Sequence, residues 1–212
     1  MAVFLDSAVL EEARAAAGYG FVVGATTNPA LLVKAGHTDF FSALSQLCGI
    51  FSGAVFYQLT RRTLPEMRDE YHRFRQAGLN LGLKIPCTLI GLQFAAEVSG
   101  EAIVAVTSVF HPGQAYLAAQ AGARYVIPYV NRVTRYTGDG PGLVADLVAV
   151  LAGTSCDVLA AGVKSPAEAV ETVLAGAQNI SVPLAVIEGM AENTLSQQAL
   201  AEFDNVLAGW KV

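Results

Sequence analysis

Short apolar runs recur along this chain and alternate with longer segments of helical periodicity. Several helical segments begin at a capping residue or a proline and end at a glycine, as in Ser165-Pro166 and Ala175-Gly176. The expected strands are residues 3–6, 21–24, 54–59, 79–84, 103–107, 125–129, 158–161 and 179–182. The expected helices are residues 9–17, 40–49, 64–77, 89–98, 114–121, 143–151 and 166–175. This alternation predicts an α/β fold with a parallel sheet and helical crossovers.

About eight such units in 212 residues predict a single (β/α)8 TIM barrel. An open doubly wound sheet is the alternative, and it is disfavoured because no Gly-x-Gly-x-x-Gly turn follows the first apolar run. No linker or low-complexity stretch divides the chain, so residues 1–212 are expected to form one domain. Residues 196–212 are expected to add a C-terminal helix that packs on the barrel or on a neighbouring subunit, because Leu200, Phe203, Leu207 and Trp210 share one face.

Composition narrows the class of protein. Hydrophobic residues make up 53% of the chain and mean hydropathy is +0.45, which raises the question of a membrane span. No uninterrupted apolar stretch reaches about 18 residues, so no membrane association is expected. A net charge of −5 argues against broad nucleic-acid binding but leaves room for a local anion pocket.

Cysteine and histidine placement bears on compartment and on metal binding. The chain begins without the basic start and apolar stretch of a secretory signal. Its three cysteines are scattered through apolar contexts, which indicates reduced thiols and a cytoplasmic protein (Cys48, Cys87 and Cys156). Its three histidines show no paired ligand spacing, so no metal site is expected (His37, His72 and His111).

Polar residues follow the apolar runs at the point where each expected strand ends. In a (β/α) barrel these ends surround one mouth, where catalytic residues lie. Each residue also has a structural explanation: Asp6 could cap a helix, Tyr129 could be a core aromatic and Arg132 could be a solvated loop charge. Convergence on one mouth favours function. The set comprises Asp6, Thr26-Thr27-Asn28-Pro29, Gln58, Lys84, Thr107-Ser108, Tyr129-Val130-Asn131-Arg132 and Gly162-Val163-Lys164-Ser165.

Lys84 carries the most specific chemistry in this set. It ends a short apolar run that Pro86 then stops. A lysine there is either a surface residue with its ammonium in water or an amine held in a dry pocket. In the second case desolvation lowers the pKa and leaves a neutral nucleophile that can form a Schiff base with a ketone.

Four segments together resemble the transaldolase family, and more closely its small members, which include fructose-6-phosphate aldolase. They are Gly24-Ala25-Thr26-Thr27-Asn28-Pro29, Leu83-Lys84-Ile85-Pro86-Cys87-Thr88, Val106-Thr107-Ser108-Val109-Phe110 and Ile127-Pro128-Tyr129-Val130-Asn131-Arg132. The match runs in order over essentially the whole chain. The resemblance implies a (β/α)8 barrel, metal-free catalysis without a cofactor, and a homo-oligomer such as a pentamer or decamer.

The resemblance also implies a role for each residue. Lys84 forms the Schiff base, Asp6 orients the donor hydroxyls and assists proton movement, and a catalytic water is held at the Gln58, Thr107 and Tyr129 positions. Thr26, Asn28 and Ser108 bind the dihydroxyacetone hydroxyls. Arg132 clamps a phosphate through its planar fork, with Lys164 beside it. Asn131 and Gly162 complete the implied substrate-binding set.

Gln58 and Tyr129 separate two branches of the family. Transaldolases resemble one another in having glutamate and phenylalanine at these positions, whereas fructose-6-phosphate aldolases look like this chain at both. The main expectation is therefore an aldolase that cleaves fructose 6-phosphate or a related ketose to dihydroxyacetone and an aldehyde such as glyceraldehyde 3-phosphate.

Two alternatives stay open beside the aldolase. The first is a transaldolase of the pentose phosphate pathway, which moves the dihydroxyacetone unit from sedoheptulose 7-phosphate or fructose 6-phosphate to an aldose phosphate. The second is a non-catalytic barrel that binds a sugar phosphate.

Gly162 departs from the family, which usually has a phosphate-binding serine at this position. Losing that hydroxyl weakens a contact to a charged group by roughly 1.5–3 kcal/mol, so the phosphorylation state of the acceptor is an open question.

Overall fold

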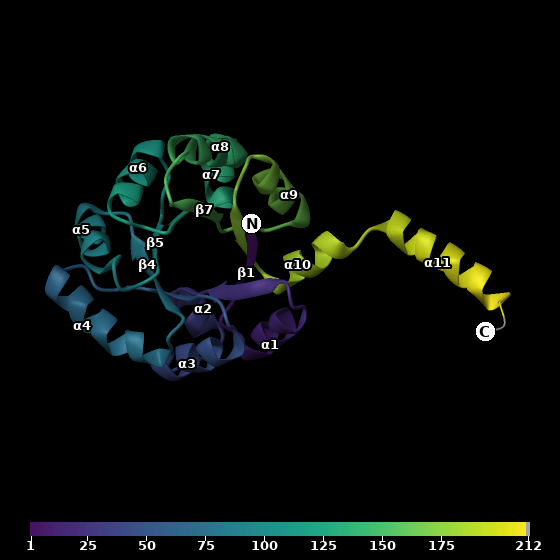
Figure 1. Ribbon diagram of the computed structural model, residues 1–212, viewed down its shortest axis with the longest axis horizontal. Coiled ribbons are helices and arrows are strands. Elements are labelled where there is room, and N and C mark those ends of the chain that lie inside the picture. Colours follow the sequence, from purple (N-terminus) through teal and green to yellow (C-terminus); the bar gives the residue numbers. More distant parts are fainter. Residues whose placement is uncertain (211–212) are drawn as a thin grey trace.

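Eight parallel strands close into a barrel in the computed structural model, which describes residues 1–210 (Figure 1). Each strand pairs with its neighbours in chain order, and β1 pairs with β8 to complete the ring. The predicted (β/α)8 barrel is thereby confirmed. The strands are β1 (Ala2–Asp6), β2 (Val22–Thr26), β3 (Val55–Gln58), β4 (Leu81–Pro86), β5 (Val104–Thr107), β6 (Tyr125–Ile127), β7 (Asp157–Ala160) and β8 (Asn179–Val182).

Helices cover the outside of this ring (Figure 1). Those expected from periodicity are present with ends shifted by up to three residues, and the expected helix over residues 64–77 is divided into α4 and a short 3-10 turn. They are α1 (Leu10–Gly18), α3 (Phe40–Ile50), α4 (Leu64–Phe74), α5 (Leu89–Val98), α6 (Pro112–Gln120), α8 (Gly140–Val150) and α9 (Pro166–Leu174). Periodicity missed α2 (Pro29–Lys34), α7 (Val130–Thr137) and α10 (Leu184–Ala191). Within residues 1–210, no helix is both long and apolar enough to cross a membrane.

Side chains along each strand point alternately outward, toward the helices, and inward, into the barrel. The inward-facing side chains form two layers. A buried inner cluster fills the barrel, with Phe4, Phe56 and Ile127 among its members. Phe4 and Phe56 lie with ring centroids 6.0 Å apart. Gly82 makes room for Phe56, because a Cβ at Gly82 would lie only 2.6 Å from the Phe56 ring.

On β1, β3 and β4, a polar side chain comes two residues beyond this apolar layer, on the same face of the strand. Asp6 follows Phe4, Gln58 follows Phe56 and Lys84 follows Gly82. The period of two along a strand therefore places these polar residues directly above the buried apolar cluster, at the carboxyl end of the barrel. This stacking positions the candidate site.

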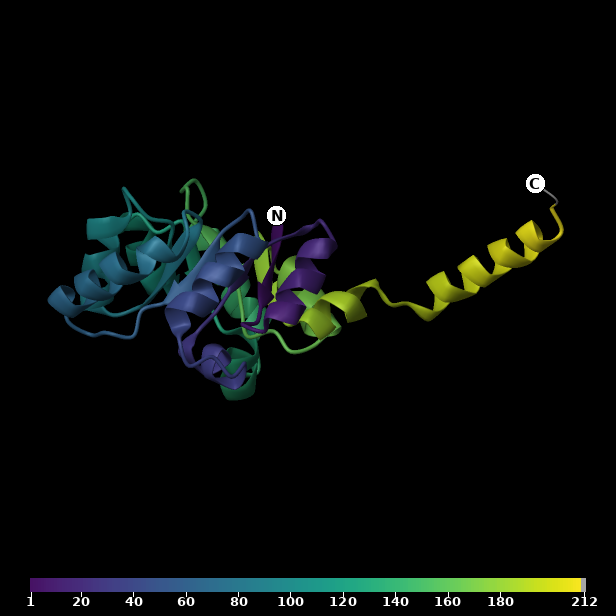
Figure 2. The ribbon, with the colours of Figure 1, turned by 90° about the horizontal axis from the view of Figure 1, so that it is seen from below.

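The C-terminal helix α11 (Thr194–Ala208) extends away from the barrel (Figures 1 and 2). None of its residues is buried, and Leu200, Phe203 and Leu207 are all exposed. A helix over this segment was expected, but packing on its own barrel is not what the structure has. Packing of this helix on a neighbouring subunit, the other expected arrangement, stays a prediction. Residues 211–212 of the expected segment lie outside the described residues.

Candidate active site

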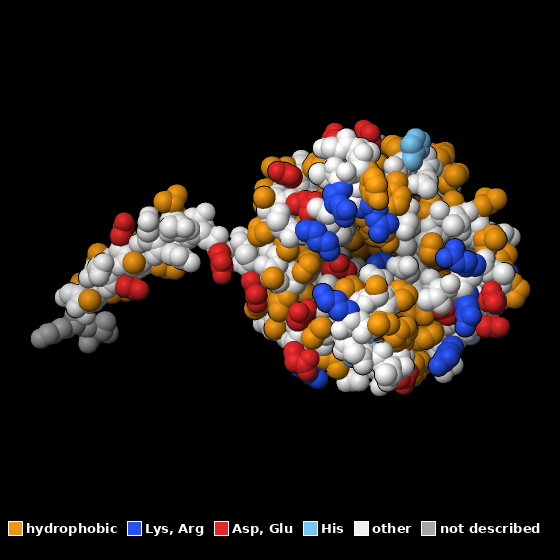
Figure 3. Space-filling view, turned by 180° about the vertical axis from the view of Figure 1, so that it is seen from behind, with side chains coloured by type: hydrophobic (Ala, Val, Ile, Leu, Met, Phe, Trp, Pro, Cys, Tyr) orange, Lys and Arg blue, Asp and Glu red, His pale blue; other side chains and the backbone are white. Residues whose placement is uncertain are grey.

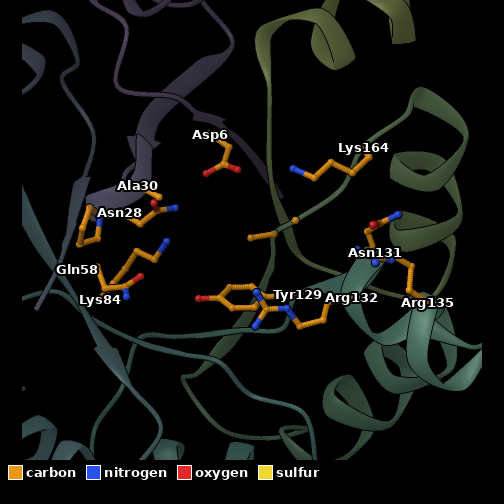
Figure 4. A pocket seen from close by; sticks show the side chains of 13 residues that line it. Asp6, Asn28, Ala30, Gln58, Lys84, Tyr129, Asn131, Arg132, Arg135 and Lys164 are labelled. Carbon is orange, nitrogen blue, oxygen red and sulfur yellow. The ribbon is translucent and has the colours of Figure 1, made fainter. Parts of the chain in front are cut away.

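A cavity of about 580 Å³ opens at the carboxyl ends of the strands (Figure 4). One face of the molecule is visibly hollowed at its centre, and several Lys and Arg side chains lie around the hollow (Figure 3). The cavity is lined by Asp6, Asn28, Pro29, Ala30, Gln58, Lys84, Tyr129, Asn131, Arg132, Arg135, Ala161, Gly162 and Lys164.

Lys84 reaches this cavity from β4 while remaining almost fully buried, with only 2% of its surface exposed. Its strand neighbours at the same level are Gln58 on β3 and Ala105 on β5. Burial lowers the pKa of the Lys84 amine from its usual 10.5, because desolvation disfavours the ammonium, while the nearby Asp6 and Tyr129 oppose that shift. The structure thus has the buried amine of the two alternatives, and a neutral amine is a nucleophile.

Asp6 lies across the cavity from Lys84 (Figure 4) and is held by a chain of hydroxyls. The Thr26 hydroxyl donates to Asp6 Oδ1 at 2.9 Å, and the Ser181 hydroxyl lies 2.7 Å from Thr26 Oγ1. A hydroxyl has a single proton, so if Thr26 donates to Asp6 then Ser181 must donate to Thr26. Two fully buried hydroxyls thereby orient the carboxylate from behind the cavity wall.

The Tyr129 hydroxyl is bracketed by two side chains from the end of β5. Thr107 Oγ1 lies 2.8 Å from it, and Ser108 Oγ donates to it at 3.3 Å. Ser108 is, within residues 1–210, the one residue other than glycine with a positive φ, at 62°. A left-handed serine is sparsely populated and tends to mark functional sites. These hydroxyls fix the phenol where it lines the cavity beside Arg132 (Figure 4).

Asn28 serves two purposes. Its Oδ1 accepts from the Leu31 amide at 3.0 Å and so caps α2. Its carboxamide also lines the cavity (Figure 4). Asn28 therefore combines a structural role as a helix cap with a place in the cavity wall.

Cations gather on the side of the cavity away from Lys84 (Figure 4). The Arg132 guanidinium lies over the Tyr129 ring, 4.9 Å from its centroid. Arg135 and Lys164 line the same side. Glu168 braces this region, because its two carboxylate oxygens accept from Asn131 Nδ2 at 3.1 Å and from the Lys164 amide at 2.6 Å.

The structure brings most of the expected site residues to the cavity wall. Of the residues to which the resemblance assigns a role, three do not line the cavity: Thr26 and Thr107 are fully buried behind it, and Ser108 contacts Tyr129. Their contacts support Asp6 and Tyr129. Residues 1–210 contain no group of three or more His, Cys, Asp or Glu side chains that could hold a metal ion.

The amino-acid sequence as a whole matches the family model described as Transaldolase/Fructose-6-phosphate aldolase over residues 3–211. The chain belongs to this family. A probable transaldolase of Moorella thermoacetica is 35% identical over 214 residues, which cover 100% of this chain and 98% of that protein. A probable transaldolase of Prosthecochloris aestuarii is also 35% identical, with 96% of each chain covered.

Comparison of structures adds support for the fold alone. A mandelate oxidase solved with (S)-2-phenylpropionate superimposes with a TM-score of 0.61 at 17% identity, covering 87% of this chain and 64% of that one. Another mandelate oxidase structure, solved with benzoyl-formic acid, gives a TM-score of 0.61 at 16% identity. At such identity the likeness indicates the barrel architecture and carries no statement about chemistry.

Three residues of this transaldolase/fructose-6-phosphate aldolase family member escaped the sequence analysis. Arg135 lines the cavity, Ser181 holds Thr26, and Glu168 braces Asn131 and Lys164. The sequence carried a signal for Glu168, because Ser165-x-x-Glu168 is a capping-box pattern, and the Ser165 hydroxyl indeed accepts from the Glu168 amide at 3.2 Å. It carried none for Ser181, which stands alone between apolar residues of β8.

Proposed function

We propose that this chain is a Schiff-base enzyme that takes a three-carbon dihydroxyacetone unit from a ketose phosphate and passes it to an aldose phosphate. The observation that carries the proposal is the buried Lys84 amine, with its lowered pKa, at the wall of a cavity that also holds Asp6 and Tyr129. Membership of the transaldolase/fructose-6-phosphate aldolase family supports the same chemistry.

The reaction begins when Lys84 Nζ attacks the ketone carbon and water leaves to give an iminium. The bond between the third and fourth carbons then breaks, and its electron pair moves into the iminium to form an enamine. The proton of the fourth-carbon hydroxyl leaves as the aldehyde forms. Asp6 and a water near Gln58 and Tyr129 are the proposed groups for this proton transfer, because proton transfer needs hydrogen-bond reach, directly or through one water.

Transfer to a second aldose phosphate is the fate that the comparisons favour. The relatives from Moorella thermoacetica and Prosthecochloris aestuarii both carry the description "Probable transaldolase" and match this chain along nearly its whole length. In this reading the enamine attacks the aldehyde carbon of the acceptor, the new carbon–carbon bond forms, and the aldehyde oxygen takes up a proton to become a hydroxyl. Hydrolysis of the resulting iminium then frees Lys84.

Release of free dihydroxyacetone is a second candidate, and the side chain at position 129 favours it. Tyr129 has an ionisable hydroxyl, held by Thr107 and Ser108 at the cavity wall. If the Tyr129 hydroxyl supplies a proton to the enamine carbon, hydrolysis of the resulting iminium releases dihydroxyacetone, and the enzyme is an aldolase. Gln58 also favours the aldolase, because transaldolases are similar to one another in having a glutamate at this position, where this chain has a neutral amide.

An assay of fructose 6-phosphate cleavage with and without an added aldose phosphate tests both candidates. Transfer predicts consumption of fructose 6-phosphate only when an acceptor such as erythrose 4-phosphate is present. Aldol cleavage predicts free dihydroxyacetone without any acceptor. Borohydride reduction during either reaction is expected to attach the three-carbon unit to Lys84. A protein that binds the sugar phosphate and never gives this adduct is a binding barrel, contrary to the proposal.

Replacing Tyr129 with phenylalanine is expected to lower the release of free dihydroxyacetone relative to transfer by about 10²-fold, because the enamine loses its nearest ionisable hydroxyl. The two products are measured together in one reaction that contains an acceptor. Tyr116→Phe is the matched control, since Tyr116 is exposed on α6 away from the cavity. Equal product ratios in Tyr129→Phe and the unchanged protein would remove the role proposed for the phenol.

A homo-oligomer is also proposed, because α11 leaves apolar side chains exposed along its whole length. Deleting residues 196–212 is expected to yield smaller particles in light scattering, since a helix that buries nothing on its own barrel can bury its apolar face only against another molecule. Replacing Glu202 and Asp204 on the same helix with glutamine and asparagine is the control, because it keeps the apolar residues. An unchanged mass after the deletion would count against oligomerisation through α11.

A further inference from the structure

We infer that Arg135 is a specificity-determining residue, which binds the phosphate of the sugar substrate together with Arg132. This inference rests on the proposed function, and it concerns which substrates the site prefers. Arg135 would replace the phosphate contact that is lost because Gly162 has no hydroxyl. The substrate class that it implies is a sugar carrying a dianionic phosphate at the end remote from the ketone.

The placement of Arg135 follows from helix α7. Residues three apart on a helix lie on the same face, so Arg135 follows Arg132 one turn further along α7. Both side chains line the cavity, and Lys164 lines it from the loop after β7 (Figure 4). The Arg132 guanidinium is held over the Tyr129 ring, 4.9 Å from the ring centroid.

The charges of these three cations are not neutralised inside the protein. The ion pairs found within residues 1–210 join Arg14 to Glu11, Arg68 to Glu97, Arg75 to Glu101 and Arg124 to Asp157. None of them involves Arg132, Arg135 or Lys164. Glu168, the carboxylate that contacts this region, uses both oxygens on Asn131 and on the Lys164 amide. The cavity therefore has a cationic side that is suited to an anion with more than one negative charge.

Two backbone amides at the start of α7 are already engaged. The Val130 amide donates to the Ala161 carbonyl at 2.9 Å, and the Asn131 amide donates to the Gly162 carbonyl at 3.4 Å. Gly162 itself has a φ of 68°, which a residue with a side chain adopts only with strain. Side-chain donors are abundant on this side, because two arginine forks provide several N–H groups with the geometry that phosphate oxygens accept.

The test compares fructose 6-phosphate with fructose, the same ketose without the phosphate. In Arg135→Gln, the ratio of kcat/KM on fructose 6-phosphate to kcat/KM on fructose is expected to fall by about 10-fold, the lower end expected for losing a charge-assisted hydrogen bond. Arg135→Lys is expected to lose less, because it keeps the charge without the fork. The inhibition constant of inorganic phosphate against fructose 6-phosphate is expected to rise in parallel.

Arg73→Gln is the matched control, because Arg73 lies on α4 with its guanidinium over Phe74, away from the cavity. An unchanged substrate ratio in both Arg135 variants, or an equal fall in Arg73→Gln, would overturn the inference. Failure of the proposed function has a different signature. If borohydride with dihydroxyacetone, which carries no phosphate, leaves Lys84 of the unchanged protein unlabelled, the Schiff base is wrong. If Lys84 is labelled and the ratio stays constant, only the assignment of Arg135 is wrong.

Discussion

Replacing Lys84 with methionine is expected to abolish both transfer and cleavage of the ketose, by roughly 10⁴-fold or more. Methionine fills a similar volume but has no amine, so neither the iminium nor the enamine can form. The measurement is turnover of fructose 6-phosphate together with mass spectrometry after borohydride reduction. Adduct formation should disappear along with turnover. Persistence of an adduct on another lysine would show that the covalent residue was wrongly assigned.

Lys34→Met is the control, because Lys34 lies exposed at the end of α2. It should retain both activity and the Lys84 adduct. Lys84→Met should also be folded, and thermal melting can show this.

Burial of Lys84 also makes stability depend on pH. The folded-state pKa of Lys84 is lower than the usual 10.5, so at pH values between the two the unfolded chain binds more protons than the folded protein.

The sign of the stability effect follows from that difference. The contribution of Lys84 to the free energy of unfolding is complete above pH 10.5, and it is lost as the pH falls through the lowered folded-state pKa. Methionine does not titrate. The melting temperature of Lys84→Met should therefore exceed that of the unchanged protein by a margin that grows as the pH falls through this window. A margin that grows toward alkaline pH would contradict the burial of the amine.

Alternation along the strands made much of the barrel and the site predictable from the sequence. Each apolar run ends near a polar residue, and in a closed parallel barrel those ends necessarily face one mouth. Strand ends were less predictable. Residues 125–129 were expected as one strand, but β6 ends at Ile127 because Pro128 has no amide to donate and Tyr129 then begins α7 as its N-cap.

Helix α7 was missed because its signal is short and its surface is polar. Only Val130 and Val133 are buried, so two apolar positions three residues apart were the sole periodic cue in a helix of eight residues. Gly138, with a φ of 84°, ends the helix in the left-handed conformation typical of a C-terminal glycine. Without the helix, Arg135 had no expected position relative to Arg132.

The hydroxyl chain behind Asp6 was beyond prediction for a different reason. It joins β1, β2 and β8, and β8 is brought beside β1 only by closure of the ring, across most of the chain length. A serine within an apolar strand has the same local pattern whether it faces a helix or the barrel interior. Ser181 could therefore be assigned a neighbour only after the register of β1 against β8 was known.

Asp6→Asn is expected to lower kcat by about 10²- to 10⁴-fold, the range typical of a lost general acid or base. It should also move the pH profile in a defined direction. Schiff-base formation needs the neutral amine, so the rate of adduct formation rises with pH through the pKa of Lys84. The Asp6 carboxylate raises that pKa against the lowering effect of burial, so its removal should shift the rising limb to lower pH.

Thr26→Val is the matched control for Asp6→Asn. It removes the hydroxyl that donates to Asp6 at 2.9 Å while the carboxylate and its charge remain. The loss of one donor weakens the orientation of Asp6, so a smaller fall in kcat is expected, of about 10-fold. Its rising limb should not move to lower pH as in Asp6→Asn, because the carboxylate that favours the Lys84 ammonium is still present. A limb that moves to higher pH in Asp6→Asn would mean that the carboxylate does not favour the ammonium, and the electrostatic link between Asp6 and Lys84 would then have to be abandoned.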